Sequence, residues 1–301
     1  MRQRRVILSF PTKHGEDAES LKEQSDILLK NQKVLDGLNI RFVVKINGEP
    51  NIPAEMFCDI YNLTTEDLNF LTTSAATWLK KQSLIQLHAG YDNDVRLIFS
   101  GLIMDAPPSG NPDVALHIRA ISGYEWMKKP INVNKKNITI QKLLEFVSQK
   151  TGYKIIESAD TEQNEFLQTV LPSFSFTGTP IELLAEIQNM CGGIVVDNKG
   201  FMISVYNDSI NISEQKKPTK GNLIISSQTG MIGYPELTGV GVNVKILLNT
   251  NIKCGDWITV QSSRVKDANN TFQVTGVRHS GESRGNEFYT VLECRRPKQG
   301  E

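Results

Sequence analysis

Alternating apolar and polar residues near the carboxyl end constrain the fold of this chain more than any other feature. Every second residue from Val240 to Ile246 is apolar, which is the spacing that buries one face of a β-strand. Gly255 and Asp256 mark a turn into the next apolar segment. The strands predicted in this C-terminal block are residues 240–246, 257–260, 271–279 and 287–294. Four short strands separated by turns predict a small closed or nearly closed β-barrel.

A second strand-rich block lies near the amino end. Apolar residues alternate again over residues 40–46, and the Asn47-Gly48 pair that follows is typical of a hairpin turn. Thr64 precedes a carboxylate at the spacing of a helix start, so a short helix is predicted to interrupt the strands. Residues 13–36 are polar and predict an inserted loop or marginal helix. The further strands predicted here are residues 56–63, 84–89, 95–104 and 114–121.

The middle of the chain changes to a helical period. Apolar residues at i, i+3, i+4 and i+7 from Ile140 predict an amphipathic helix that ends near Gly152. A second helix is predicted to begin where Thr179 and Glu182 have the spacing of a capping box. A predicted hairpin and a polar exit linker complete this part, at residues 194–205 and 207–221. The middle is therefore predicted to be a small α+β module.

Length and composition exclude several classes of protein. The 301 residues suffice for two or three domains, and 33 basic and 33 acidic residues leave no net charge to attract nucleic acid or an anionic membrane. No segment approaches the ~20 consecutive apolar residues of a membrane span, and the apolar run behind the basic amino end is too short for a signal peptide. The scattered cysteines favour reduced thiols over disulfides or a metal site: Cys58, Cys191, Cys254 and Cys294.

Two sets of motifs resemble one known family. In the C-terminal block they are Gly233-Tyr234-Pro235, the turn of residues 251–256, and residues 274–279, which end in histidine. In the N-terminal block they are Phe99, Gly101, Ile103, Pro112, Asp113, His117 and Gly123. In order and spacing both sets resemble the phage baseplate hub family, over about two thirds of the chain. Residues 13–36 depart from the family pattern.

The resemblance implies a non-enzymatic hub at the distal end of a phage tail tube. The implied fold is mainly β: two tube-like β-barrel domains, residues 1–125 and 211–301, flank the α+β module, residues 126–210. The implied assembly is a homotrimer that joins the six-fold tail tube protein to the three-fold central spike protein. The resemblance also implies contacts with the tape-measure protein and other baseplate proteins. It implies that DNA meets the protein only while passing through the lumen, and that neither a membrane nor a cofactor is involved. The protein is expected in the virion tail, after assembly in the bacterial host cytoplasm.

No interface residue is assigned from the sequence. As a hypothesis, residues 98–104 and 240–248 occupy equivalent places in the two barrels, so that a charge at Phe99 or Val242 is predicted to break assembly. One alternative is a hub or spike component of a contractile injection system, for which a β-helical needle after residue 296 is expected and no such repeat is found.

The other alternative is a β-rich cell-wall hydrolase. Residues 281–285 match Gly-x-Ser-x-Gly, with Ser283 as the candidate nucleophile and His279 two residues before the start of the motif. That motif requires a strand-to-helix turn, whereas here it lies between two predicted strands, which favours a hairpin loop. The four histidines also lack the i, i+4 pairing that binds zinc from one helix: His14, His88, His117 and His279. No catalytic or metal-binding residue is therefore predicted.

Overall fold

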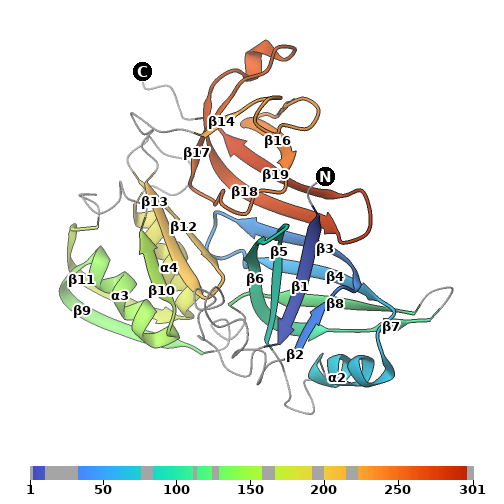
Figure 1. The fold of residues 1–301 in the computed structure, drawn as a ribbon. Coiled ribbons are helices and arrows are strands. Elements are labelled where there is room, and N and C mark those ends of the chain that lie inside the picture. The colour runs from blue at the N-terminus through green and yellow to red at the C-terminus, as the bar shows by residue number, and fades with distance from the viewer. Residues whose placement is uncertain are drawn as a thin grey trace.

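The computed structural model describes residues 3–10, 33–75, 84–110, 114–123, 129–157, 167–191, 200–214 and 223–296. Figure 1 shows two β blocks, one of them at the top in orange and red, and an α+β module at the left. The N-terminal block comprises β1 (Arg4–Phe10), β2 (Lys33–Asp36), β3 (Asn39–Asn47), β4 (Glu55–Tyr61), α2 (Thr65–Ala75), β5 (Leu84–Tyr91), β6 (Asp94–Asp105), β7 (Pro108–Ser109) and β8 (Ala115–Ile121).

The module comprises β9 (Ile131–Thr139), α3 (Ile140–Thr151), β10 (Lys154–Glu157), β11 (Val170–Gly178), α4 (Pro180–Met190), β12 (Phe201–Tyr206) and β13 (Ser209–Glu214). The C-terminal block comprises β14 (Leu223–Ile225), β15 (Glu236–Leu237), β16 (Gly241–Leu247), β17 (Trp257–Val260), the 3₁₀ turn η4 (Lys266–Ala268), β18 (Thr271–Glu282) and β19 (Phe288–Arg295). The mainly β class with a small α+β module is confirmed.

The two β blocks form one continuous sheet. Its strand order is β15-β16-β19-β18-β3-β4-β8-β6-β5-β1-β2, with β17 also on β18, β14 on β17 and β7 on β8. β18 joins the blocks because it pairs with β19 on one edge and with β3 on the other, from Gly276 opposite Asn47 to Glu282 opposite Arg41. Within the described residues no strand path closes on itself, so the predicted closure of each block into a barrel is not found.

One hydrophobic core lies under both blocks. Phe42 and Phe99 from the N-terminal block and Val244 and Leu292 from the C-terminal block belong to the same buried cluster. At the junction, Phe42 meets Phe288 edge-on, with ring centroids 6.4 Å apart. Burying each such side chain contributes roughly 1.5–3 kcal/mol, so the blocks stabilise one another.

The module has a second core of its own. Apolar side chains of α3 and α4 pack against β12 and β13, and Leu144, Leu184, Ile203 and Ile210 are almost completely buried there. β12 and β13 pair antiparallel, and β10 adds a parallel strand beside β13. The module therefore has a core of its own, while Met202 and Tyr206 of β12 are buried in the core of the large sheet.

Polar contacts at both ends of one hairpin fasten the module to the large sheet, and they include Oγ of Ser100, which donates to Oδ2 of Asp208 at 3.2 Å. The backbone N–H of Ser100 on β6 donates to Oδ1 of Asn207 at 2.9 Å, in the turn between β12 and β13. At the far end of β13, Nε2 of Gln273 donates to the carbonyl oxygen of Glu214 at 3.0 Å. Both ends of one hairpin are therefore held against the sheet.

The helices begin and end where local chemistry predicts. Oγ1 of Thr139 accepts from the N–H of Lys142 at the start of α3, and Gly152 ends that helix with φ of 77°. At the start of α4, the N–H of Thr179 donates to Oε2 of Glu182 at 2.7 Å and Oγ1 of Thr179 accepts from the N–H of Glu182 at 3.4 Å. This capping box confirms the prediction.

The predicted polar linker at residues 207–221 is wrong in its first half. Residues 209–214 form β13, and Ile210 and Ile212 on this strand are buried. Asn207 and Asp208, with φ of 50° and 55°, form the two-residue turn that returns the chain beside β12. The strand was missed because its buried polar residues make the segment look solvated.

Other predictions meet the structure in part. The predicted insertion at residues 13–36 ends in a strand, β2, which pairs with β1 and buries Leu35. The rest of that insertion, and the first strand of the hairpin predicted at residues 194–205, lie outside the described residues. Val240 is 60 % exposed because β16 begins after it, so its predicted place in the core is wrong.

Candidate functional site

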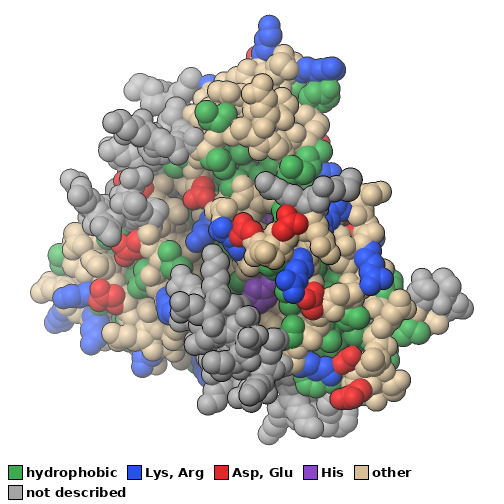
Figure 2. Space-filling view, in the orientation of Figure 1, with side chains coloured by type: hydrophobic (Ala, Val, Ile, Leu, Met, Phe, Trp, Pro, Cys, Tyr) green, Lys and Arg blue, Asp and Glu red, His purple; other side chains and the backbone are tan. Residues whose placement is uncertain are grey.

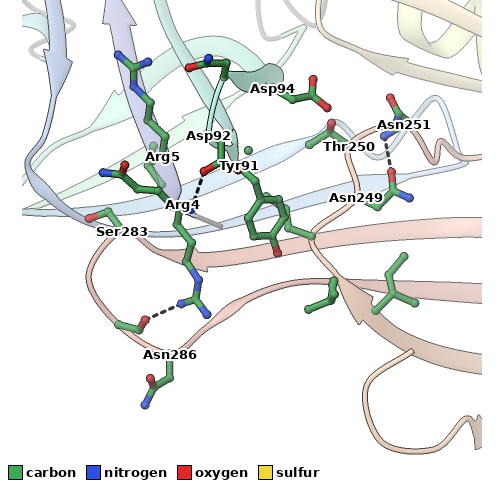
Figure 3. Close-up of a pocket in the computed structure, with 18 of the residues that line it drawn as sticks. Arg4, Arg5, Tyr91, Asp92, Asp94, Asn249, Thr250, Asn251, Ser283 and Asn286 are labelled. Atoms are coloured by element: carbon green, nitrogen blue, oxygen red, sulfur yellow. Dashed lines mark hydrogen bonds between the residues drawn. The ribbon is translucent and has the colours of Figure 1, made fainter. Parts of the chain in front are cut away.

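A cleft of about 1560 Å³ lies between the two β blocks and is called the central cleft below. On one side it is lined by the start of β1 and the turn between β5 and β6. On the other side are β14 and the segment that follows β16, and the loop between β18 and β19 also borders it. Figure 3 shows Arg4, Tyr91 and Asn249, from these separate parts of the chain, around the same space.

Charged side chains in the central cleft are engaged with the protein itself. Nη1 of Arg4 donates to the carbonyl oxygen of Gly285 at 2.6 Å, which ties β1 to the β18–β19 loop (Figure 3). The guanidinium carbon of Arg4 also lies 5.4 Å from the ring centroid of Phe288. Arg5 forms an ion pair with Asp36 at 2.7 Å. These charged groups hold separate segments of the cleft wall together, so their role here is structural.

The turn between β5 and β6 has a tightly specified shape. Oδ1 of Asp92 accepts from the N–H of Gln3 at 2.8 Å, and the N–H of Asp92 donates to the carbonyl oxygen of Gln3 at 2.7 Å. A Cβ atom on Gly90 would lie 1.9 Å from the carbonyl oxygen of Asp94, so only glycine fits at that position. The wall of the cleft is therefore preformed.

The C-terminal block exposes seven large apolar side chains, called the C-terminal apolar set below. Hydrophobic surface is visible over the upper part of the molecule, which this block forms (Figure 2). The set is Leu223, Ile224, Ile232, Tyr234, Leu237, Val240 and Leu247, each at least 36 % exposed. Leu223, Ile224 and Leu247 also line the central cleft. The wall of the cleft formed by the C-terminal block is therefore partly apolar.

Ser283 does not have the surroundings of a nucleophile. Its Oγ accepts from the N–H of Ile40 at 2.9 Å and donates to the carbonyl oxygen of Leu38 at 2.8 Å. Both bonds fasten the β18–β19 loop to the start of β3. Ser283 borders the central cleft, but His279 does not. The Gly-x-Ser-x-Gly match is therefore a hairpin loop, as its place between strands predicted.

His279 is a core residue of β18. Its side chain is 3 % exposed, and Nδ1 lies 2.9 Å from Oγ1 of Thr290 on β19. Burial lowers the pKa of His279 to about 4, so the ring is neutral near pH 7. The pair of Ser283 and His279 that the hydrolase alternative requires is not assembled.

The remaining candidates also have structural surroundings. His88 is buried on β5, where burial lowers its pKa to about 4, and His14 lies outside the described residues. All four cysteines are free and buried, and burial raises the pKa of the Cys191 thiol to about 12. Among the described residues, no group of three or more His, Cys, Asp or Glu is placed to hold a metal ion. In the same part of the chain, no helix has the length and apolar character needed to cross a bilayer.

The family of the chain follows from a comparison of its sequence with known families. The family described as "Baseplate hub gp41" matches residues 24–294. The chain belongs to this baseplate hub family. The resemblance drawn from the two sets of motifs is therefore confirmed, and the protein is a structural component of a phage tail baseplate.

Solved structures with a similar fold include tail proteins of full length. A 43 kDa tail protein of prophage MuSo2 from Shewanella oneidensis has a TM-score of 0.62 and 10 % identity, over 98 % of this chain and 97 % of that one. A tail protein from Neisseria meningitidis MC58 has a TM-score of 0.59 and 9 % identity, over 97 % and 96 %. At such identities the likeness establishes a shared fold.

A type VI secretion component has the same fold. The Escherichia coli protein c3393 has a TM-score of 0.55 and 10 % identity, over 87 % of this chain and 74 % of that one. No curated protein matches the sequence significantly.

Sequence reasoning missed the exposed apolar side chains of the C-terminal block. It assigned Phe99 and Val242 as positions where charge breaks assembly, but both side chains are fully buried, so a charge there acts on folding first. Tyr234 belongs to one of the quoted family motifs and is 53 % exposed. That motif was the one available signal for the exposed apolar surface, because alternation alone does not tell a core face from a contact face.

Proposed function

We propose that this hub protein is a trimeric adapter between the six-fold tail tube and the three-fold central spike. The family match over residues 24–294 carries the proposal, and the full-length likeness to two tail proteins supports it. In this role the protein lies in the virion tail after assembly in the host cytoplasm. Its partners are the tail tube protein, the central spike protein, the tape-measure protein and other baseplate proteins. DNA meets the protein only while it passes through the lumen of the ring.

A trimer suits the change of symmetry because each subunit supplies two β blocks. Three subunits then present six β blocks to a six-fold tube, while the ring keeps three-fold symmetry for the spike. The continuous sheet supports this arrangement, since β18 and β3 hold the two blocks of one subunit in a fixed relation. The role needs surfaces that bind, and no chemical step.

The C-terminal apolar set is the surface we assign to subunit or tube contacts. Leu237 is 54 % exposed on β15, a strand of two residues at the end of the sheet path. Val240, three residues further along the chain, is 60 % exposed, and Leu247 at the end of β16 is 54 % exposed. A neighbouring strand can extend such an edge through backbone hydrogen bonds while it covers the apolar side chains.

Native mass spectrometry of the purified chain, alone and co-expressed with the tail tube protein of the same phage, tests the proposal. We expect a species of three chains, alone or with the tube protein. The variant Leu237→Asp with Val240→Asp should lose it. Ile52→Asp, a matched change at a side chain 45 % exposed in the N-terminal block, should retain it. A chain that stays monomeric with every tail partner present would refute the adapter role.

A contractile injection system is the second candidate setting. The fold shared with the Escherichia coli type VI secretion component favours it. The two settings are distinguished by which tube protein is captured: co-expression with a phage tube protein and with a type VI tube protein should give one complex and not the other.

A further inference from the structure

Three side chains on the N-terminal block form a hydrogen-bonded chain that lies outside the central cleft. Asp59 on β4 is directly opposite His117 on β8 in their antiparallel ladder. Oδ1 of Asp59 lies 2.7 Å from Nδ1 of His117. The other ring nitrogen, Nε2, lies 3.0 Å from Oγ of Ser109 on β7. One imidazole thus connects a carboxylate to a hydroxyl.

The order of these atoms matches what acyl transfer needs. A carboxylate that accepts from Nδ1–H holds the imidazole in the tautomer whose Nε2 has a free lone pair. That lone pair accepts the hydroxyl proton of Ser109, which makes Oγ a stronger nucleophile. The same three groups in the same order activate serine in hydrolases of unrelated folds.

Regular structure holds all three residues in place. Asp59 and His117 are a cross-strand pair in the interior of the sheet, between β3 and β6. Ser109 is opposite Ala115 in the β7–β8 ladder, and the N–H of His117 donates to the carbonyl oxygen of Pro107 at 3.1 Å. Groups placed by strands keep their geometry better than groups on free loops.

A small ester can reach the Ser109 end of this hydrogen-bonded row of side chains. Ser109 is exposed, and the side chain of His117 is 46 % exposed. Gly110 follows the serine, and no described atom lies within 4 Å of where its Cβ would be, so a carbonyl group can approach the backbone there. Phe57, 40 % exposed, lies two residues before Asp59 on the same face of β4 and offers an apolar contact.

We propose that Ser109, His117 and Asp59 form an acyl-transfer site that hydrolyses short carboxylic esters. Oγ of Ser109 attacks the ester carbonyl carbon and its proton passes to Nε2 of His117. The bond to the alcohol oxygen breaks, and the alcohol leaves with the proton from Nε2. Water then attacks the acyl-serine in the same way and releases the carboxylic acid. The backbone N–H of Gly110, after the nucleophile, is the donor assigned to the oxyanion.

Labelling of the full-length protein with an alkyl fluorophosphonate, followed by intact-mass and peptide mapping, tests the site. We expect one addition, on Ser109, and hydrolysis of p-nitrophenyl acetate by the unlabelled protein. Ser109→Ala should remove the label, and Ser109→Ala and His117→Gln should each reduce hydrolysis about 100-fold or more. Asp59→Asn should reduce it through loss of the correct tautomer, with the fold unchanged.

Ser263→Ala, at another exposed serine, is the matched control and should keep both the label and the rate. Circular dichroism of each variant should match that of the parent protein, since the three side chains lie on the surface of the sheet. Label on a different residue, no label at all, or an unchanged rate in Ser109→Ala would each overturn the proposal. The result bears on this site alone, because the adapter role requires no catalysis.

Discussion

The two β blocks share one core but differ in what they expose. In the N-terminal block, the large apolar side chains on the surface are scattered, and lysines lie over two of them: Lys45 over Phe57 at 5.6 Å and Lys33 over Phe70 at 4.8 Å. The C-terminal block exposes seven within residues 223–247, of which six are aliphatic and one, Tyr234, has the guanidinium carbon of Arg264 5.2 Å from its ring centroid. The difference teaches that one fold can spread its exposed apolar side chains thinly in one block and concentrate them in a short stretch of sequence in the other.

Two substitutions on β16 should separate the buried face of the C-terminal block from its exposed face. Val242 is completely buried, so Val242→Asp places an unpaired carboxylate in the core and should prevent folding, at a cost of more than about 4 kcal/mol. Leu247, 54 % exposed, is the matched control, and Leu247→Asp should change the free energy of unfolding by less than about 0.5 kcal/mol.

Thermal unfolding followed by circular dichroism, with light scattering for molecular mass, checks this pair. Leu247→Asp should melt like the parent protein but associate less. If both substitutions lowered the free energy of unfolding equally, β16 would not have one buried and one exposed face.

A substitution at the junction should reveal whether the blocks unfold together. Phe42, 1 % exposed, contacts Phe288 of the other block, and Phe42→Ala should lower the free energy of unfolding by about 3–5 kcal/mol. Because the core is shared, the β blocks should still unfold in one transition, seen by both tryptophan fluorescence and far-UV circular dichroism. Two separated transitions would mean that each block is stable alone.

Acid should weaken both blocks through one buried histidine in each. Burial lowers the pKa of His88 and of His279 from 6.5 to about 4. The unfolded chain therefore takes up protons below pH 6.5 that the folded chain does not. Stability is full above pH 6.5 and falls toward pH 4, by roughly 3 kcal/mol for each histidine.

Urea unfolding between pH 7.5 and pH 4.5 measures this slope. His279→Gln and His88→Gln should each flatten it by a similar amount, since the two side chains are similarly buried. A slope that neither substitution changes would show that other groups cause the acid sensitivity.

A substitution in the α+β module should cause a smaller loss of stability, and the loss should be confined to the module. Thr179→Ala removes the capping box of α4 and should cost about 1 kcal/mol. The loss should appear as faster hydrogen exchange in α4, because the module has its own core. Thr139→Ala, at the start of α3, is the comparison within the module. Equal acceleration in β3 and β18 would indicate that the module and the blocks form one cooperative unit.

Predictions from sequence succeeded where the signal is local. The capping box at Thr179 and the end of α3 at Gly152 depend on groups within a few residues, and both are confirmed. β13 was missed because Asn211 and Ser209 are polar yet buried, and Nδ2 of Asn211 donates to Oγ of Ser209 at 3.0 Å. In sequence, a polar residue that is buried inside the fold cannot be told from a polar residue in water.

Candidate sites show the same limit of prediction from sequence, since closeness in sequence does not give closeness in the fold. Ser283 and His279 are neighbours in sequence, yet one is fastened to β3 and the other is buried against Thr290. Asp59 and His117 are far apart in sequence, and register alone places them opposite each other.

The sequence by itself determined the period of each segment, the turns and caps between segments, and the family to which the chain belongs. Only the tertiary structure decided that β18 pairs with β3 and that one sheet spans both blocks. The physical reason is that every strand edge offers the same N–H and C=O groups, so a local pattern cannot choose a partner. The choice comes from side chains that pack across the junction, such as Phe42 against Phe288, and these meet only when the chain is folded.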